Sequence, residues 1–226
     1  CIYHAYKNRK PYYWYFLVFF IPVLGSLIYI VTQVYNQNDV EKIQDEITTV
    51  LNPTKKLKNL EKNIEFIDTY TNRIQLADTY FRNNDFTNAI ENYKITLKDT
   101  VQDHLYAREQ LILCYTGLDA YSAVIKQAEF IKTRAEFKGS KQQFCYGLAL
   151  KEMGEIEAAE IQLKQIDRPY SNYAERLELA KLYLETDRRN AGEDLLNEIY
   201  TESQNMTKTN KNLYRATIAE VEKLLK

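Results

Sequence analysis

The chain has 226 residues, and its 30 lysines and arginines almost balance its 31 aspartates and glutamates, for a formal net charge of −1. This balance argues against broad nucleic-acid binding, which needs a basic face, and the low counts of glycine (6) and proline (4) favour long helices over turn-rich sandwiches and barrels. The three cysteines form no Cys-x-x-Cys motif and no histidine pair exists, so the sequence predicts neither a disulfide framework nor a metal or other cofactor.

The first predicted element is a membrane-spanning helix. Residues 11–38 contain no charged side chain, and the apolar stretch within them predicts a transmembrane helix over residues 12–35. At ~1.5 Å per residue, about 22 apolar residues reach ~33 Å, which is enough for a hydrocarbon core of ~30 Å. Aromatic side chains at both ends, such as Trp14 and Tyr35, are typical of rings at a membrane interface. Residues 1–10 are then the remnant of a preceding helix and a basic loop.

A second feature of this stretch is its pattern of proline, glycine and large apolar residues. The pattern consists of Ile21, Pro22, Leu24, Gly25, Leu27, Ile28 and Tyr29. It resembles the N-terminal membrane module of cardiolipin synthases and phospholipase D nucleases, which is a two-helix hairpin. The chemistry of that family uses His-x-Lys motifs, whereas tyrosine stands two places after both His4 and His104. The resemblance therefore implies an anchor without the enzyme.

The charges that flank the predicted span give its orientation. Lys7, Arg9 and Lys10 precede it, whereas Lys42 is the only cation close behind it, among acidic residues. Cytoplasmic loops carry an excess of lysine and arginine. The sequence therefore predicts localisation in a bacterial inner membrane, with membrane lipids as partners of the anchor and the large domain in the periplasm.

Residues 36–69 are predicted to form a linker and entry helices. A short helix over residues 41–52 ends before Pro53, because the residue before a proline disfavours the helical conformation. Four lysines follow, and they form either a solvated face or a contact with anionic lipid head groups. These lysines are Lys55, Lys56, Lys58 and Lys62.

A repeat dominates the remainder of the chain. A large apolar residue, then a small or apolar one, then tyrosine or leucine three places later, recurs from Leu76, Leu111, Tyr146 and Leu179, at spacings of 35, 35 and 33 residues. A turn and a small residue such as Ala89 follow each instance. The period is close to the ~34 residues of a helical-hairpin repeat. One hairpin cannot cover its own apolar face, so stacked units bury a shared core.

These repeats resemble the tetratricopeptide repeat (TPR) family, most closely at residues 86–93 and 154–160. The early tryptophan of that family is absent, and its signature glycine is present only as Gly147. The resemblance implies an all-α fold, in which the transmembrane helix precedes a right-handed α-solenoid of helix hairpins. The repeats are predicted at about 70–103, 105–138, 140–172 and 173–205. Residues 206–226 are predicted to form a terminal helix that caps the stack, with partner docking as the alternative.

No catalytic set is visible, because no nucleophile elbow or phosphate-binding loop occurs. The chain is therefore predicted to be a non-enzymatic, membrane-anchored scaffold or adaptor that binds a protein or peptide and no nucleic acid. The predicted partner groove, lined by the first helix of each repeat, consists of Asp78, Phe81, Arg82, Glu109, Phe144, Lys151, Lys181 and Leu184. The alternative, suggested only by the anchor, is a regulator or assembly factor of a phospholipid-synthesis complex.

Overall fold

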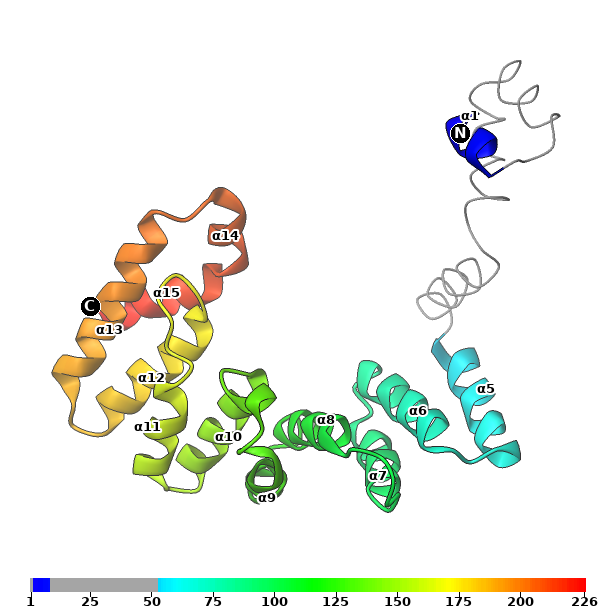
Figure 1. The fold of residues 1–226 in the computed structure, drawn as a ribbon. Helices are drawn as coiled ribbons and strands as arrows, with labels where there is room; N and C mark the ends of the chain where they lie inside the picture. The colour runs from blue at the N-terminus through cyan, green and yellow to red at the C-terminus, as the bar shows by residue number, and fades with distance from the viewer. Residues whose placement is uncertain (1, 9–52) are drawn as a thin grey trace. The chain divides into compact units, whose positions relative to one another are not determined.

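The computed structural model describes residues 2–8 and 53–226, which form helices joined by turns and short loops, with no strand among them (Figure 1). The chain divides into two compact units, Cys1–Asn59 and Leu60–Lys226. In the first unit, the short helix α1 spans Ile2–Lys7. Helix α5, Pro53–Phe66, begins in the first unit and ends in the second. Proline is well suited to this first helical position, because the amide that it lacks has no partner there.

Consecutive helices of the second unit pair into hairpins. The hairpins are α6 (Tyr70–Arg82) with α7 (Phe86–Thr96), α8 (Leu105–Thr116) with α9 (Tyr121–Ile131), α10 (Lys141–Glu152) with α11 (Ile156–Lys164), and α12 (Tyr173–Glu185) with α13 (Arg189–Gln204). The second helix of each hairpin contacts the first helix of the next, and a 3-10 turn, η2 at Ala135–Phe137, precedes α10 (Figure 1). The predicted all-helical solenoid of hairpins is thus confirmed.

Each hairpin turn contains one residue in the left-handed conformation. These residues are Asn84 (φ 59°), Asp119 (φ 52°), Gly154 (φ 82°) and Asp187 (φ 56°). The amide of the following residue donates to a carbonyl five positions earlier, from Asp85 to Tyr80 at 2.9 Å and from Arg188 to Tyr183 at 3.0 Å. This bond is the mark of the Schellman motif that ends a helix. Glycine, asparagine and aspartate adopt the left-handed conformation at the lowest cost, which explains why they occupy these turns.

Small residues allow the helices to approach each other closely. Ala77, Ala89 and Ala159 are completely buried. A methyl group at Gly147 would lie only 2.9 Å from Cδ2 of Leu163, so a side chain there would force Leu163 to shift. Because protein interiors are close-packed, these positions set the distance between the helices and hence the shape of the shared core.

Each hairpin also has a polar contact between its two helices, which we call the hairpin pair. Its first member has an equivalent repeat position in all four hairpins, and its second member follows 19 residues later in the first three and 22 residues later in the fourth. The pairs are Arg73 with Asn92 (3.0 Å), Arg108 with Gln127 (2.8 Å), Gln143 with Gln162 (2.9 Å) and Arg176 with Glu198 (3.0 Å). The first members follow one another at the spacings of the apolar pattern, 35, 35 and 33 residues. A polar side chain half-buried between two helices is stable only when its partner is present.

Two neighbouring repeats, the second and the third, each contain a buried cysteine thiol. Cys114 in α8 and Cys145 in α10 are free and buried. Burial raises the pKa of Cys114 to about 12 and also raises the pKa of Cys145. Both thiols therefore stay protonated at neutral pH and pack as small apolar groups.

The chain ends in two short helices, α14 (Lys208–Leu213) and α15 (Arg215–Leu224). Helix α15 contacts both α12 and α13, and its Val221 is completely buried. The rings of Tyr173 and Tyr214 meet edge to face, with their centres 4.9 Å apart. The sequence pattern predicted one terminal helix, whereas the chain forms two that meet at Tyr214. Capping of the stack by this segment stays a prediction.

The predicted membrane-spanning helix, residues 12–35, and the predicted helix over 41–52 lie outside the described residues. Within residues 2–8 and 53–226, no helix is both long enough and apolar enough to cross a bilayer. The longest of them, α13, has 16 residues, which reach ~24 Å, and it carries charges such as Asp194 and Glu198. This finding contradicts the predicted localisation in a bacterial inner membrane with a periplasmic domain, and we do not retain it.

The left-handed turns give a first prediction. A methyl group at Gly154 would meet no atom within 4 Å, so Gly154→Ala changes only the cost of its positive φ. We expect this variant to lose about 1 kcal/mol of unfolding free energy in urea titrations. Gly154→Asn should lose less, because asparagine tolerates this conformation, as Asn84 does in the first turn. Equal losses in the two variants would contradict this explanation.

Candidate protein-binding surface

The residues predicted to form a partner groove all lie on the first helices of the hairpins. Helix α6 carries Asp78, Phe81 and Arg82, α8 carries Glu109, α10 carries Phe144 and Lys151, and α12 carries Lys181 and Leu184. Arg82 is exposed, and the other seven are half-buried. Half-buried side chains can contact a ligand and still pack against their neighbours, so the surroundings of each one decide what it can offer.

Asp78 joins three helices. The hydroxyl of Tyr93 in α7 donates to Oδ1 of Asp78 at 2.5 Å, and the hydroxyl of Tyr106 in α8 donates to both carboxylate oxygens at 3.0 Å. Tyr93 is completely buried, whereas Tyr106 is 42% exposed. Because two hydroxyls occupy this carboxylate, it holds the first two repeats together more than it offers a free charge.

The two predicted lysines of the groove also have partners. Nζ of Lys151 in α10 lies 2.9 Å from Oε2 of Glu185, at the end of α12. Nζ of Lys181 lies 3.0 Å from Oε1 of Glu178 within α12. Polar contacts therefore link α6 to α8 and α10 to α12, and α8 packs directly on α10. Together the first helices make one face that runs across the repeats.

Arg82 and Glu109 offer charge on this face. Among residues 2–8 and 53–226, no carboxylate forms an ion pair with Arg82. Burial raises the pKa of Glu109, and the negative charge of Glu136 raises it further. Arg82 is therefore a free cation at the surface, and Glu109 is a partly desolvated acid that a cation would stabilise.

Phe81 and Leu184 differ from the expectation that they face a partner. They occupy equivalent repeat positions, one residue before the end of the first helix. The rings of Phe81 and Phe86 are 5.7 Å apart, and a methyl group at Gly192 would lie 2.8 Å from Cδ2 of Leu184. Both side chains thus pack against the second helix of their own hairpin. The first-helix pattern alone does not show this contact, because it depends on residues beyond the turn.

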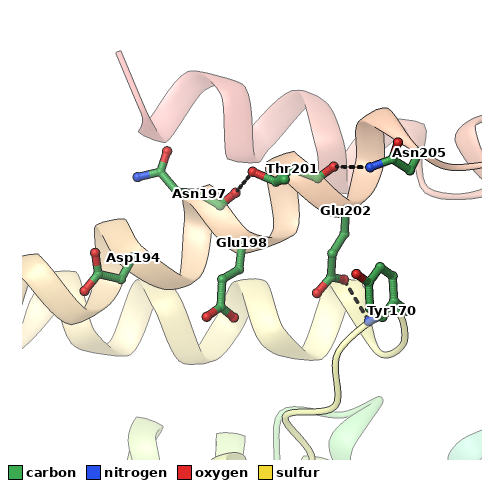
Figure 2. A pocket seen from close by; sticks show the side chains of 7 residues that line it. All are labelled: Tyr170, Asp194, Asn197, Glu198, Thr201, Glu202 and Asn205. Atoms are coloured by element: carbon green, nitrogen blue, oxygen red, sulfur yellow. Dashed lines mark hydrogen bonds between the residues drawn. The ribbon is translucent and has the colours of Figure 1, made fainter.

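A pocket of about 550 Å³ on the last hairpin was not predicted from the sequence (Figure 2). Figure 2 shows carboxylates along one side of α13 and amide or hydroxyl groups along its other edge. The lining residues are Tyr170, Asp194, Asn197, Glu198, Thr201, Glu202 and Asn205. The spacing of the acids by four was visible in the sequence, but a solvated helix face has the same pattern.

Two acids of this pocket, Glu198 and Glu202, neutralise Arg176, whose side chain is completely buried. Its guanidinium donates to Oε2 of Glu202 at 2.8 Å and to Oε2 of Glu198 at 3.0 Å. Nε lies 2.7 Å from Oδ1 of Asp167, close enough for an ion pair but not aligned as a hydrogen bond. Glu202 also accepts the amide of Tyr170 at 2.8 Å. These contacts fix α13 to α12 and to the loop before it.

A metal role for these acids has no support in the described part of the chain. Within residues 2–8 and 53–226, no group of histidine, cysteine, aspartate and glutamate side chains could hold a metal ion. Glu198 and Glu202 of α13 instead balance the charge of the buried Arg176, which is a structural role.

Comparisons with known proteins identify the fold. MamA (residues 41 to the end) from Desulfovibrio magneticus RS-1 superposes with a TM-score of 0.65 at 12% identity, over 74% of this chain and 95% of that one. YrrB, a TPR protein with an unusual peptide-binding site, superposes with a TM-score of 0.58 at 12% identity, over 86% and 95%. A putative kinesin light chain of Podosopora anserina gives 0.53 at 16% identity, over 70% and 89%. No family model and no curated protein matches the sequence. At these identities the likeness shows a TPR-like fold.

The buried guanidinium gives a second prediction. Arg176→Met leaves Glu202, whose side chain is 9% exposed, without its counter-ion, and we expect a loss of about 3–5 kcal/mol of unfolding free energy. The double variant Arg176→Met/Glu202→Gln should recover part of that loss, because it removes the uncompensated charge. The control, Arg189→Met, breaks an exposed pair with Glu193 and should cost less than about 1 kcal/mol. Urea unfolding at neutral pH measures all three, and similar losses for Arg176→Met and Arg189→Met would refute the assignment.

The tyrosines bonded to Asp78 predict a pH dependence. Burial raises the pKa of Tyr93 above its usual range, with the bond to Asp78 adding to it, and burial and the charge of Asp78 raise the pKa of Tyr106 to about 12. Unfolded tyrosine titrates near pH ~10. Above that pH the unfolded chain has lost protons that the folded chain keeps, so the free energy of unfolding falls until the folded hydroxyls titrate.

The side chain of the Tyr93→Phe variant has no hydroxyl to ionise. Its free energy of unfolding, measured in urea titrations, should therefore fall less steeply between about pH 9 and pH 11. Tyr200→Phe, at an exposed hydroxyl with no bond among the described residues, is the control and should keep the slope of the original chain. An unchanged slope in Tyr93→Phe would contradict the role given to this hydroxyl.

Proposed function

We propose that this chain is a non-catalytic scaffold that binds an extended segment of a partner protein along the face of α6, α8, α10 and α12. One observation carries the proposal: contacts from Asp78 to Tyr106 and from Lys151 to Glu185 tie successive first helices into a face that crosses repeat boundaries. Faces of stacked hairpins suit extended ligands, because each repeat adds another place for a side chain of the ligand.

The charges on this face suggest the chemistry of the partner. Asp78, Lys151 and Lys181 have partners within the chain, whereas Arg82 is exposed and has none among the described residues. The half-buried ring of Phe144 adds an apolar contact in the third repeat. We therefore propose a segment that places a carboxylate opposite Arg82 and an apolar side chain near Phe144. The likeness in fold to YrrB, whose peptide-binding site is its stated feature, supports a protein or peptide as the ligand.

The alternative function, regulation of a phospholipid-synthesis complex, depends on the resemblance of the first 35 residues to a membrane module. The structure describes only residues 2–8 of that segment. The alternative therefore stays a prediction, and no contact in the described residues adds to it.

Charge reversal tests the proposed face. Partners are captured by crosslinking to the full chain, identified by mass spectrometry and purified, and their dissociation constants are then measured. Arg82→Glu should weaken binding about tenfold or more, because it turns an attraction into a repulsion at the interface. The matched control is Lys126→Glu, at an exposed residue of the second helix α9, which should leave binding unchanged. Equal affinities for Arg82→Glu and Lys126→Glu would remove the face as the binding site.

A further inference from the structure

The hairpin pairs differ in how their arginines are neutralised. In the first repeat, Arg73 bonds to Asp68 through Nε and Nη2, each at 2.7 Å. In the fourth repeat, Arg176 has three acidic neighbours. In the second repeat, Arg108 holds Gln127 through Nη1, and no carboxylate among the described residues pairs with it.

The acid that would neutralise Arg108 is present but engaged elsewhere. Asp103 stands five places before Arg108, as Asp68 stands five places before Arg73. Its Oδ2 accepts from Nη2 of Arg134 at 2.8 Å, and its Oδ1 accepts the amide of Leu105 at 2.9 Å. The second repeat thus keeps the arginine and the aspartate of the first, but it pairs the aspartate with another cation.

The pKa values of Arg73 and Arg108 are shifted in opposite directions. The bond to Asp68 raises the pKa of Arg73, whereas desolvation lowers the pKa of Arg108. The guanidinium of Arg108 is half-buried and lies over the ring of Phe130, 3.9 Å from its centre. A cation on an aromatic ring is stabilised only in part, and a planar guanidinium keeps a fork of donors that matches a carboxylate.

A pocket opens where this counter-ion is missing. It measures about 220 Å³ and lies between the start of α8 and the end of α9. Leu105, Phe130 and Ile131 provide an apolar wall, and the polar lining residues are Gln102, Asp103, His104, Arg108 and Arg134. Nδ1 of His104 is buried and has no hydrogen-bond partner among the described residues. Two arginines against the one aspartate leave the pocket with an excess of positive charge.

We propose that this pocket binds a carboxylate carried on a short apolar chain, with Arg108 as its counter-ion. The carboxylate takes the place that Asp68 has beside Arg73, and the apolar chain lies against Phe130 and Ile131. The carboxylate comes from a free small acid or from a glutamate side chain of a partner. The pocket contains none of the residues of the proposed partner face, so it stands or fails independently of that function.

Matched pairs of probes test this site on the full chain. Isovalerate carries the carboxylate and the short apolar chain, and isovaleramide has the same shape without the charge. The tripeptides acetyl-Gly-Glu-Gly-amide and acetyl-Gly-Gln-Gly-amide make the same comparison for a peptide. Binding is followed by NMR from the Nε–Hε signal of Arg108 and the ring signals of Phe130. We expect at least one carboxylate probe to bind about tenfold or more tightly than its amide, and the stronger one identifies the source.

Two variants at equivalent positions complete the test. Arg108→Gln removes the charge but keeps a donor for Gln127, and it should abolish the preference for the carboxylate. Arg73→Gln makes the same change in the first repeat, where Asp68 supplies the counter-ion, and should leave binding unchanged. The proposal is wrong if acid and amide bind the original chain equally, if Arg108→Gln keeps the preference, or if inorganic phosphate binds more tightly than either carboxylate. If Arg108→Gln does not fold, the comparison of acid and amide on the original chain still decides whether the pocket prefers a carboxylate.

Discussion

A hairpin of two short helices exposes an apolar face that it cannot cover alone, and the whole fold depends on how closely the next hairpin can approach. That distance is set where Ala77, Ala89 and Ala159 lie fully buried and where Gly147 leaves room for Leu163. Close approach brings the first helices onto one face. It also brings polar side chains that are distant in sequence within hydrogen-bond reach, such as Tyr106 and Asp78. The candidate binding face is therefore a product of core packing, and its geometry follows from residues that no ligand touches.

The same repeat position serves different purposes along the stack. At the position of the hairpin pair, Arg176 is enclosed by acids and acts as a structural cation. Arg108 instead lies beside a pocket whose one aspartate, Asp103, pairs with Arg134. The difference comes from small changes in neighbouring residues, because Asp103 turns to Arg134 while its equivalent Asp68 turns to Arg73. Such variation lets a repeat fold keep its hairpins while individual units change the chemistry at their edges.

The hairpins could be predicted from the sequence because their signals are local. The apolar, small and tyrosine positions recur within one turn of each helix, and Asn84, Asp119, Gly154 and Asp187 suit the left-handed turns. The first-helix location of the candidate residues followed from the same pattern. Other contacts join residues that are far apart in the sequence, such as Arg73 and Asn92, 19 positions apart, and Arg176 and Glu202, 26 positions apart. Nothing in the sequence near Arg176 distinguishes a buried guanidinium from an exposed one. For the same reason, the packing of Phe81 and Leu184 within their hairpins and the pocket on α13 emerged only from the assembled helices.

The two sulfhydryl groups of the central repeats have a practical consequence. Cys114 and Cys145 lie on successive first helices, are shielded from solvent, and stay in the unreactive protonated form. An alkylating reagent can reach them only when the helices that cover them open, so the rate of their modification reports how often these repeats open locally. The two cysteines thus serve as intrinsic probes of local unfolding in the second and third repeats, without an introduced label.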